Sequence, residues 1–243
     1  MNNDIRDEKS RIRQAVWRDL EESGVARFPR PVYHRIPNFQ GAEEAASRLF
    51  GLSWFRDASY VKVNPDSPQR MVRFHTLAEG KILLTPTPRL REGFLLLKSE
   101  ALPERMLREA STIRGMFRFG RPVGLEELPK IDLIVVGSVA VSPDGGRLGK
   151  GEGYGEIEYA LLREMKRVND KTPIVTTVHD NQIVTKIPVE EHDVPVDIIV
   201  TPKRIIETET KHRKPAGIVW RLIDERRMNE MPILKTLKER TSR

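Results

Sequence analysis

Short runs of valine, isoleucine and leucine alternate along this chain with longer segments of helical periodicity. Near-continuous apolar strands separated by helices are typical of a parallel sheet that helices cover on both faces. The pattern therefore predicts an α/β fold with a mostly parallel sheet. The predicted strands are residues 59–63, 81–85, 93–97, 131–136, 173–178 and 197–201, and the predicted helices among them are residues 41–52, 67–79, 103–117, 154–168 and 216–229.

The chain of 243 residues is long enough for one large domain, and we expect residues 1–243 to form a single α/β domain. Its N-terminal helix, residues 1–24, is amphipathic, with Val16 and Leu20 on the apolar stripe. Its C-terminal segment, residues 203–243, is basic and ends in a short predicted helix over 231–243.

The composition excludes several classes of protein. The chain has no cysteine, which rules out disulfides, thiolate metal sites and cysteine nucleophiles. No apolar run approaches the roughly 20 residues that a membrane span requires. The first residues are charged, so we expect no signal peptide and predict a cytoplasmic protein without a membrane partner. His179 and His192, each followed by an aspartate, are interpreted as loop caps because no third metal ligand stands at a recognisable spacing.

The net charge of +7 is concentrated near the C-terminus. Residues 203–243 contain twelve lysines and arginines against six acidic residues, a surplus of +6. This surplus has two interpretations: the solvated face of an amphipathic helix, or a surface that contacts nucleic acid. No interleaved aromatic residues and no RNA-recognition motif accompany the charges.

The segment 145–155, GGRLGKGEGYG, holds six glycines, one arginine and one lysine. It follows the predicted strand 131–136 and therefore lies beyond the carboxyl end of a strand, where ligands bind in such sheets. Glycines let the main chain present successive N–H groups to an anion, and Arg147 and Lys150 add cations suited to phosphate. The spacing differs from that of a Walker A loop and of the dinucleotide fingerprint. A connector without function is the alternative.

Two cations of the N-terminal helix share its apolar side. At about 100° per residue, Lys9 and Arg13 fall within roughly 40° of the apolar stripe. Lysine and arginine are seldom buried without a partner. Either both side chains extend past the edge of the core into solvent, or both point into a pocket that takes an anion.

Two stretches carry a resemblance to a known family. Residues 131–162, which include IDLIVVGSVAVSPDGGRLGKGEGYG, and residues 176–202, TTVHDNQIVTKIPVEEHDVPVDIIVTP, resemble the 5-formyltetrahydrofolate cyclo-ligase (methenyltetrahydrofolate synthetase) family. EKSRIR at 8–13 is similar to the basic first helix of that family. FPRPVYHRIPNFQGA at 28–42 and GKGEGY at 149–154 are similar to a divergent branch, the methenyltetrahydrofolate synthetase domain-containing proteins.

The resemblance implies a fold and a reaction. The implied fold is a Rossmann-like layered αβα arrangement with a mostly parallel sheet, of the type shared with ribose-5-phosphate isomerase and CoA transferases. The implied reaction depends on ATP and Mg²⁺. ATP phosphorylates the formyl oxygen of 5-formyltetrahydrofolate, N10 closes the ring, phosphate leaves, and the product is 5,10-methenyltetrahydrofolate. A reduced folate, or a related small molecule, is then the expected partner.

The resemblance also implies roles for individual residues. Lys150 and Tyr154 would act at the reacting centre, Glu156 would stand near magnesium, and Asp66 is a loose counterpart of a substrate-binding glutamate. The ATP phosphates would be held by Lys9, Arg13, Arg147, Gly149, Lys150, Gly151 and Gly153.

The match is closer for the phosphate half of the site than for the folate half. Where the family has tyrosine, tyrosine, aspartate and arginine, this chain has Tyr154, Gly155, Glu156 and Ile157. Two other functions therefore stay open: a non-catalytic module that binds RNA or nucleotides on the same fold, and an enzyme that acts on a phosphorylated metabolite.

Overall fold

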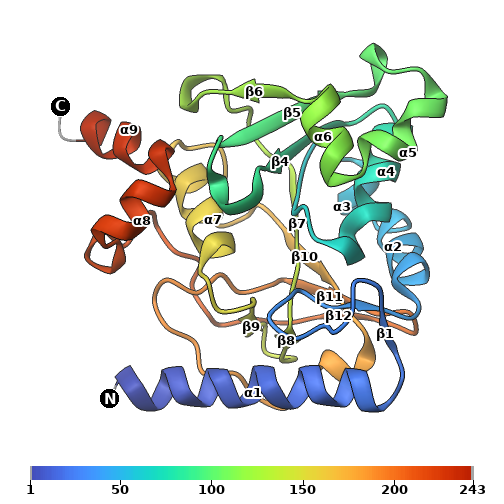
Figure 1. Ribbon diagram of the computed structural model, residues 1–243, viewed down its shortest axis with the longest axis vertical. Helices are drawn as coiled ribbons and strands as arrows, with labels where there is room; N and C mark the ends of the chain where they lie inside the picture. The colour runs from blue at the N-terminus through green and yellow to red at the C-terminus, as the bar shows by residue number, and fades with distance from the viewer. Residues whose placement is uncertain (1, 242–243) are drawn as a thin grey trace.

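The centre of the molecule is a sheet with a parallel core (Figure 1). A computed structural model describes residues 2–241, and within them one sheet has the strand order β12-β11-β10-β7-β3-β4-β5-β6. The neighbours from β11 to β4 are parallel, and both edges carry antiparallel strands, so the predicted mostly parallel sheet is confirmed. The strands are β3 (Tyr60–Val63), β4 (Ile82–Pro86), β5 (Phe94–Lys98), β6 (Arg121–Val123), β7 (Leu133–Val136), β10 (Ile174–Thr177), β11 (Ile198–Val200) and β12 (Ile205–Glu207).

Helices cover both faces of this sheet because successive strand residues point to opposite sides. In β7, Ile134 and Val136 belong to the core shared with α7 and α9, whereas Leu133 and Val135 belong to the core shared with α2 to α6. Figure 1 shows these two groups of helices on opposite sides. The helices are α2 (Ala42–Phe50), α3 (Ser53–Arg56), α4 (Arg70–Ala78), α5 (Leu107–Ala110), α6 (Ile113–Phe119), α7 (Tyr154–Glu164), α8 (Glu225–Glu230) and α9 (Pro232–Thr241).

The N-terminal helix builds a third, smaller core. α1 (Asn2–Glu22) confirms the helix predicted over 1–24, of which residue 1 lies outside the described part. Trp17 and Leu20 of α1 are buried with Leu148, close to the hairpin of β8 (Ala140–Val141) and β9 (Arg147–Leu148). In Figure 1, α1 runs across one end of the molecule beside this hairpin. A second short hairpin, β1 (Ala26–Arg27) with β2 (Asn38–Phe39), follows the helix.

The glycine-rich segment is not one continuous loop. Gly145 and Gly146 form the turn of the β8–β9 hairpin, where Gly145 has φ +91° and a Cβ on it would lie 2.6 Å from the Thr210 side chain. Arg147 and Leu148 then form β9. Only residues 149–153 form an open loop, and we call them the glycine loop.

Two predicted helices are wrong in part. The segment predicted as 103–117 is broken at Thr112, whose Oγ1 accepts a hydrogen bond from Gly115 N (3.0 Å) and so starts α6 as a new helix. The segment predicted as 216–229 contains only a 3-10 turn and α8. There Ile218 N donates a hydrogen bond to Glu164 Oε1 of α7 (3.4 Å), so this stretch packs along α7 instead of forming a helix of its own.

The C-terminal segment packs back on the fold instead of extending from it. Leu234 and Leu237 of α9 are buried in the same core as α7, so the predicted final helix exists as α9; residues 242–243 lie outside the described part. Cations of the segment pair with acidic residues elsewhere: Arg204 with Asp180, Lys214 with Asp197, Arg221 with Glu191 and Arg240 with Glu126. The positive surplus is therefore largely matched, which disfavours a free basic arm for nucleic acid. Within residues 2–241, no helix is both long and apolar enough to span a membrane.

Candidate functional site

Arg13 of α1 contacts the glycine loop directly. Its Nε donates a hydrogen bond of 2.7 Å to the carbonyl oxygen of Gly149. Its guanidinium carbon lies 3.5 Å from the position that a Cβ on Gly151 would occupy, and Gly151 has φ +100°, which residues with side chains rarely adopt. Burial lowers the pKa of Arg13 from its ordinary value, against the opposing charge of Glu156. The loop thus presents its main chain to a partly desolvated cation.

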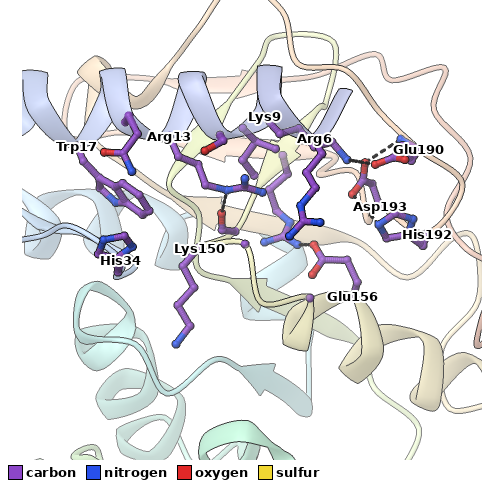
Figure 2. A pocket seen from close by; sticks show the side chains of 17 residues that line it. Arg6, Lys9, Arg13, Trp17, His34, Lys150, Glu156, Glu190, His192 and Asp193 are labelled. Carbon is purple, nitrogen blue, oxygen red and sulfur yellow. Dashed lines mark hydrogen bonds and ion pairs between the residues drawn. The ribbon is translucent and has the colours of Figure 1, made fainter. Parts of the chain in front are cut away.

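A cavity of about 550 Å³ lies between α1 and the glycine loop, and we call it the cradle cavity. Figure 2 shows Arg6, Lys9 and Arg13 entering it from α1, with Glu156 on the opposite wall. Gly153, which is the N-cap of α7, also lines it, so the N–H groups at that helix terminus border the cavity. The predicted phosphate residues Lys9, Arg13, Arg147, Gly149, Lys150, Gly151 and Gly153 all line this one cavity.

Lys9 is buried in the wall of the cradle cavity and is already paired. Its Nζ lies 2.8 Å from Glu190 Oε2 and 2.5 Å from Asp193 Oδ2 (Figure 2). Neither of the two alternatives for this side chain describes it fully, because it lines the pocket but is held by two carboxylates. Lys9 also draws the Glu190–Asp193 turn to α1, and Asp193 Oδ2 accepts a further hydrogen bond from Glu190 N (2.7 Å).

Arg147 and Glu156 form a buried ion pair below the glycine loop. The Arg147 side chain is 3% exposed, and it also donates to the carbonyl oxygens of Gly137 (3.0 Å) and Val194 (3.3 Å). Burial tends to raise the pKa of Glu156, but the charge of Arg147, together with a main-chain hydrogen bond and further positive charges nearby, holds that pKa below its ordinary value. Arg147 therefore supports the loop from beneath, and Glu156 stands as an ionised carboxylate between the cradle cavity and α7.

Lys150 extends away from α1 at the tip of the glycine loop (Figure 2). Its Nζ lies 2.6 Å from Glu152 Oε2 and 6.0 Å from the centroid of the Tyr154 ring. The side chain is 36% exposed, so solvent screens its pairing with Glu152. It lines the cradle cavity and a second cavity on the far side of the loop.

That second cavity, of about 500 Å³, is bordered by the carboxyl ends of three strands, and we call it the strand-end cavity. Asn64 follows β3, Thr87 follows β4 and Gly137 follows β7. Its wall on α7 carries Tyr154 and Glu158. This position confirms that the glycine-rich segment lies beyond the carboxyl ends of parallel strands.

A buried polar cluster, which the sequence reasoning missed, forms the floor of the strand-end cavity. Lys62 Nζ lies 2.5 Å from Glu158 Oε2, and Asn64 bridges the pair with hydrogen bonds of 3.0 Å to each. Lys62 is 1% exposed and Glu158 4% exposed. The sequence does contain a signal for this cluster, because Lys62 interrupts an apolar strand just as Lys9 interrupts an apolar helix face. Removing one member of such a buried pair is costly, since the other charge is left without its partner.

Asp66 lines the strand-end cavity near this cluster. Burial and the neighbouring charge of Glu158 raise the pKa of Asp66 to about 6, against the opposing charges of Lys150, Arg73 and Lys62. A Cβ on Gly137 would lie 2.7 Å from Asp66 Oδ2 and 3.1 Å from Gln69 Oε1. Asp66 is thus a carboxyl group that can gain or lose a proton near neutral pH.

Tyr154 stands at the first turn of α7, between the glycine loop and the C-terminal segment. Its hydroxyl lies 3.4 Å from Glu230 Oε2, and the Arg227 guanidinium lies 5.1 Å from its ring centroid. Burial and the charges of Glu230 and Glu152 raise the pKa of Tyr154. The hydroxyl therefore stays protonated at neutral pH and can donate a hydrogen bond.

The residues present fit a bound nucleotide better than they fit an independent metal cage. The described residues hold no group of three or more histidine, aspartate or glutamate side chains that could enclose a metal ion. Glu156 supplies one carboxylate beside the cavity that carries the cations. Mg²⁺ is commonly held in this way, by one or two carboxylates together with phosphate oxygens and water. The imidazole of His179 is engaged elsewhere: its Nδ1 accepts a hydrogen bond from Asn181 N (3.2 Å), which confirms the predicted loop cap.

The sequence matches the family model described as the 5-formyltetrahydrofolate cyclo-ligase family over residues 5–202. The chain belongs to this family. A methenyltetrahydrofolate synthase domain-containing protein of Mus musculus is 47% identical over 237 residues, which are 96% of this chain and 63% of that protein. The Homo sapiens protein of the same name is 45% identical over 237 residues, covering 96% of this chain and 62% of the relative. The predicted family and its divergent branch are confirmed.

The fold of this chain is also similar to that of a solved member of the cyclo-ligase family. The NMR structure of Aquifex aeolicus 5,10-methenyltetrahydrofolate synthetase superposes with a TM-score of 0.53 at 23% identity, covering 84% of this chain and 94% of that one. This likeness confirms the predicted layered α/β fold of the cyclo-ligase family. The present chain spans about three fifths of the length of its curated relatives, and its residues beyond 202 lie outside the cyclo-ligase family model.

Proposed function

We propose that this protein converts 5-formyltetrahydrofolate to 5,10-methenyltetrahydrofolate in a reaction that depends on ATP and Mg²⁺. One observation carries the proposal: the glycine loop separates a cavity bordered by Arg6 and Arg13 from a polar cavity at the strand ends. A polyphosphate on one side and a reduced folate on the other would meet at the loop. Membership of the cyclo-ligase family supports this reaction class.

The cradle cavity is suited to the phosphates of ATP. Among the described residues, no carboxylate forms an ion pair with Arg6 or Arg13, so their charges are available to an anion. The main-chain N–H groups at the start of α7 would add oriented donors, with Gly153 allowing close approach. Phosphoryl transfer needs little covalent participation by the protein and depends chiefly on positioned cations and donors.

Glu156 is the residue that we assign to magnesium. The ion, when bound with ATP, would neutralise charge that develops on the transferred phosphate. The pairing of Glu156 with Arg147 keeps the carboxylate ionised and fixes its position. Asp193 lines the same cavity but is engaged by Lys9, so we assign it to holding α1 in place.

The strand-end cavity is suited to the folate. Asn64 and Glu158 offer polar atoms to the amide and amine groups of a pteridine, and Asp66 would exchange a proton with a ring nitrogen. Lys150 and Tyr154 stand where the two cavities approach each other. We propose that Lys150 neutralises the charge of the phosphoryl group during its transfer, and that the Tyr154 hydroxyl donates a hydrogen bond to the formyl oxygen.

The decisive experiment measures formation of the methenyl product by its absorbance, with the purified chain, 5-formyltetrahydrofolate and Mg-ATP. We expect turnover that requires both ATP and Mg²⁺ and that falls by at least about a hundredfold when Tyr154 is replaced by phenylalanine. Arg11→Gln, a change at an exposed residue of α1 that lines neither the cradle cavity nor the strand-end cavity, is the control and should leave turnover unchanged. Absence of product together with absence of ATP binding in calorimetry would refute the proposal.

A further inference from the structure

The C-terminal segment returns to the glycine loop although it lies outside the part matched by the family model. Figure 1 shows α8 beside α7, and α9 is anchored by Met231, Leu234 and Leu237, which are at most 1% exposed. The Arg227 side chain lies over the Tyr154 ring, and its Nη2 is 4.0 Å from the position of a Cβ on Gly153. The segment is therefore placed to act on whatever the glycine loop binds.

A third cavity, of about 390 Å³, opens between α7 and residues 217–223, and we call it the apolar cavity. Two of its walls are apolar: one comes from α7 and the other from the returning C-terminal segment. The apolar side chains that line it are Ile157, Ala160, Ile218, Val219, Leu222 and Ile223. Where the family pattern has an arginine, this chain has Ile157, and a guanidinium from Arg227 lines the same cavity.

The apolar cavity adjoins the cradle cavity. Arg6, Gly151, Gly153, Glu156 and His192 line both of them. A ligand whose anionic end occupies the cradle cavity would therefore extend its next chemical group between α7 and Leu222. A flat or apolar group fits there, because α7 and residues 217–223 offer aliphatic surface, while the charged side chains that line the cavity come mostly from its border with the cradle cavity.

We propose that the apolar cavity binds the base and ribose of the nucleotide whose phosphates occupy the cradle cavity, and that Arg227 contacts the phosphate nearest the ribose. The inference rests on the proposed function, since it requires a polyphosphate in the cradle cavity. The flat face of a base can be buried against aliphatic side chains while its polar edge stays near solvent. The pteridine of a folate suits the strand-end cavity better, where Asn64 and Glu158 provide hydrogen-bonding partners.

The test compares Mg-ATP with magnesium tripolyphosphate by calorimetry on the full chain. Leu222→Gln changes a half-exposed wall residue (47% exposed), and Ile205→Gln is the matched control at a residue of similar exposure (40%) that lines none of the three cavities. We expect Leu222→Gln to weaken ATP binding by about fivefold and to change tripolyphosphate binding by less than about twofold. Arg227→Gln should weaken both ligands, and Ile205→Gln neither.

Other results would overturn the inference. It fails if wild-type protein binds tripolyphosphate as tightly as ATP, a comparison that needs no variant, because the nucleoside would then contribute nothing. It also fails if Leu222→Gln leaves ATP binding unchanged, weakens both ligands equally, or affects only 5-formyltetrahydrofolate. Wild-type protein that binds neither phosphate ligand would instead refute the proposed function itself. Thermal unfolding of each variant shows whether it is folded.

Discussion

Arg13 and Gly149, which are 136 positions apart in the chain, are joined by a hydrogen bond of 2.7 Å from the guanidinium Nε to the carbonyl oxygen. This contact fixes the glycine loop against α1. It uses one edge of the guanidinium and leaves the Nη atoms beside the cradle cavity, which Arg13 lines. Arg13 therefore has two tasks that can be separated by mutation: shaping the loop and attracting an anion.

Arg13→Lys keeps the positive charge but removes the forked guanidinium, and Arg13→Gln removes the charge as well. We expect Arg13→Gln to weaken tripolyphosphate binding by about tenfold or more, because a partly desolvated cation is lost. Arg13→Lys should fall between it and the wild type. Calorimetry measures both, with Arg11→Gln on the exposed side of α1 as the control. Equal affinity in all three variants would show that Arg13 serves the fold alone.

Lys9→Met should destabilise the fold by about 3 kcal/mol, because Glu190 and Asp193 would keep their charges without the buried partner. Urea unfolding followed by circular dichroism measures the free energy of unfolding. The double variant Lys9→Met, Asp193→Asn should recover part of the loss, since one uncompensated charge is removed. A double variant that is less stable than the sum of the two single changes would contradict this reading.

Asp66 should make the stability depend on pH above its unfolded pKa. Its folded pKa, raised to about 6, means that the fold favours the protonated carboxyl. This contribution is present below the ordinary pKa of an aspartate, near 4, and is lost as the pH rises through 6. The wild type should therefore lose between about 1 and 3 kcal/mol relative to Asp66→Asn between pH 4 and pH 7. Parallel unfolding curves across that range would exclude a raised pKa.

Glu156→Gln tests which of two roles Glu156 has: pairing with Arg147, or binding Mg²⁺. Without the carboxylate, the Arg147 guanidinium keeps its bonds to Gly137 and Val194 but loses its ion pair. We expect ATP to bind the variant without Mg²⁺ at least as well as it binds the wild type, because one negative charge has left the cradle cavity. Addition of Mg²⁺ should then strengthen ATP binding less than it does in the wild type. An unchanged effect of Mg²⁺ in calorimetry would assign the metal elsewhere.

Leu234→Ala should lower the free energy of unfolding of the whole chain by about 3 kcal/mol, because Leu234 is fully buried in the core that includes α7. The C-terminal segment is thus part of the folding unit.

Truncation at residue 203 should give an unstable protein. RNA binding by the intact chain should be weak even at low salt, since Arg204 and Lys214 are already paired. Tight, salt-sensitive RNA binding would revive the nucleic-acid interpretation.

Elements with strong local patterns could be predicted from the sequence. The strand at 131–136 and the helix that begins at 154 both follow from their spacing of apolar residues, and β7 and α7 lie within those ranges. The segment at 216–229 shows where such reasoning fails. Ile218 and Leu222 stand at helical spacing, but Ile218 N donates a hydrogen bond to Glu164 Oε1 of α7 (3.4 Å), so tertiary contacts compete with the local preference.

For the candidate site, the sequence by itself determined the glycine loop, its cations and the family, because these depend on residues that are neighbours in the chain. Only the tertiary structure decided that Lys9 is neutralised by Asp193, that Arg147 is held by Glu156, and that Arg227 returns to Tyr154. Charges in a folded protein are set by what stands within a few ångströms, and residues 9 and 193 share no pattern that reports their distance. The sequence therefore specifies which charged residues are present, and the tertiary structure determines which of them remain unpaired and available to a ligand.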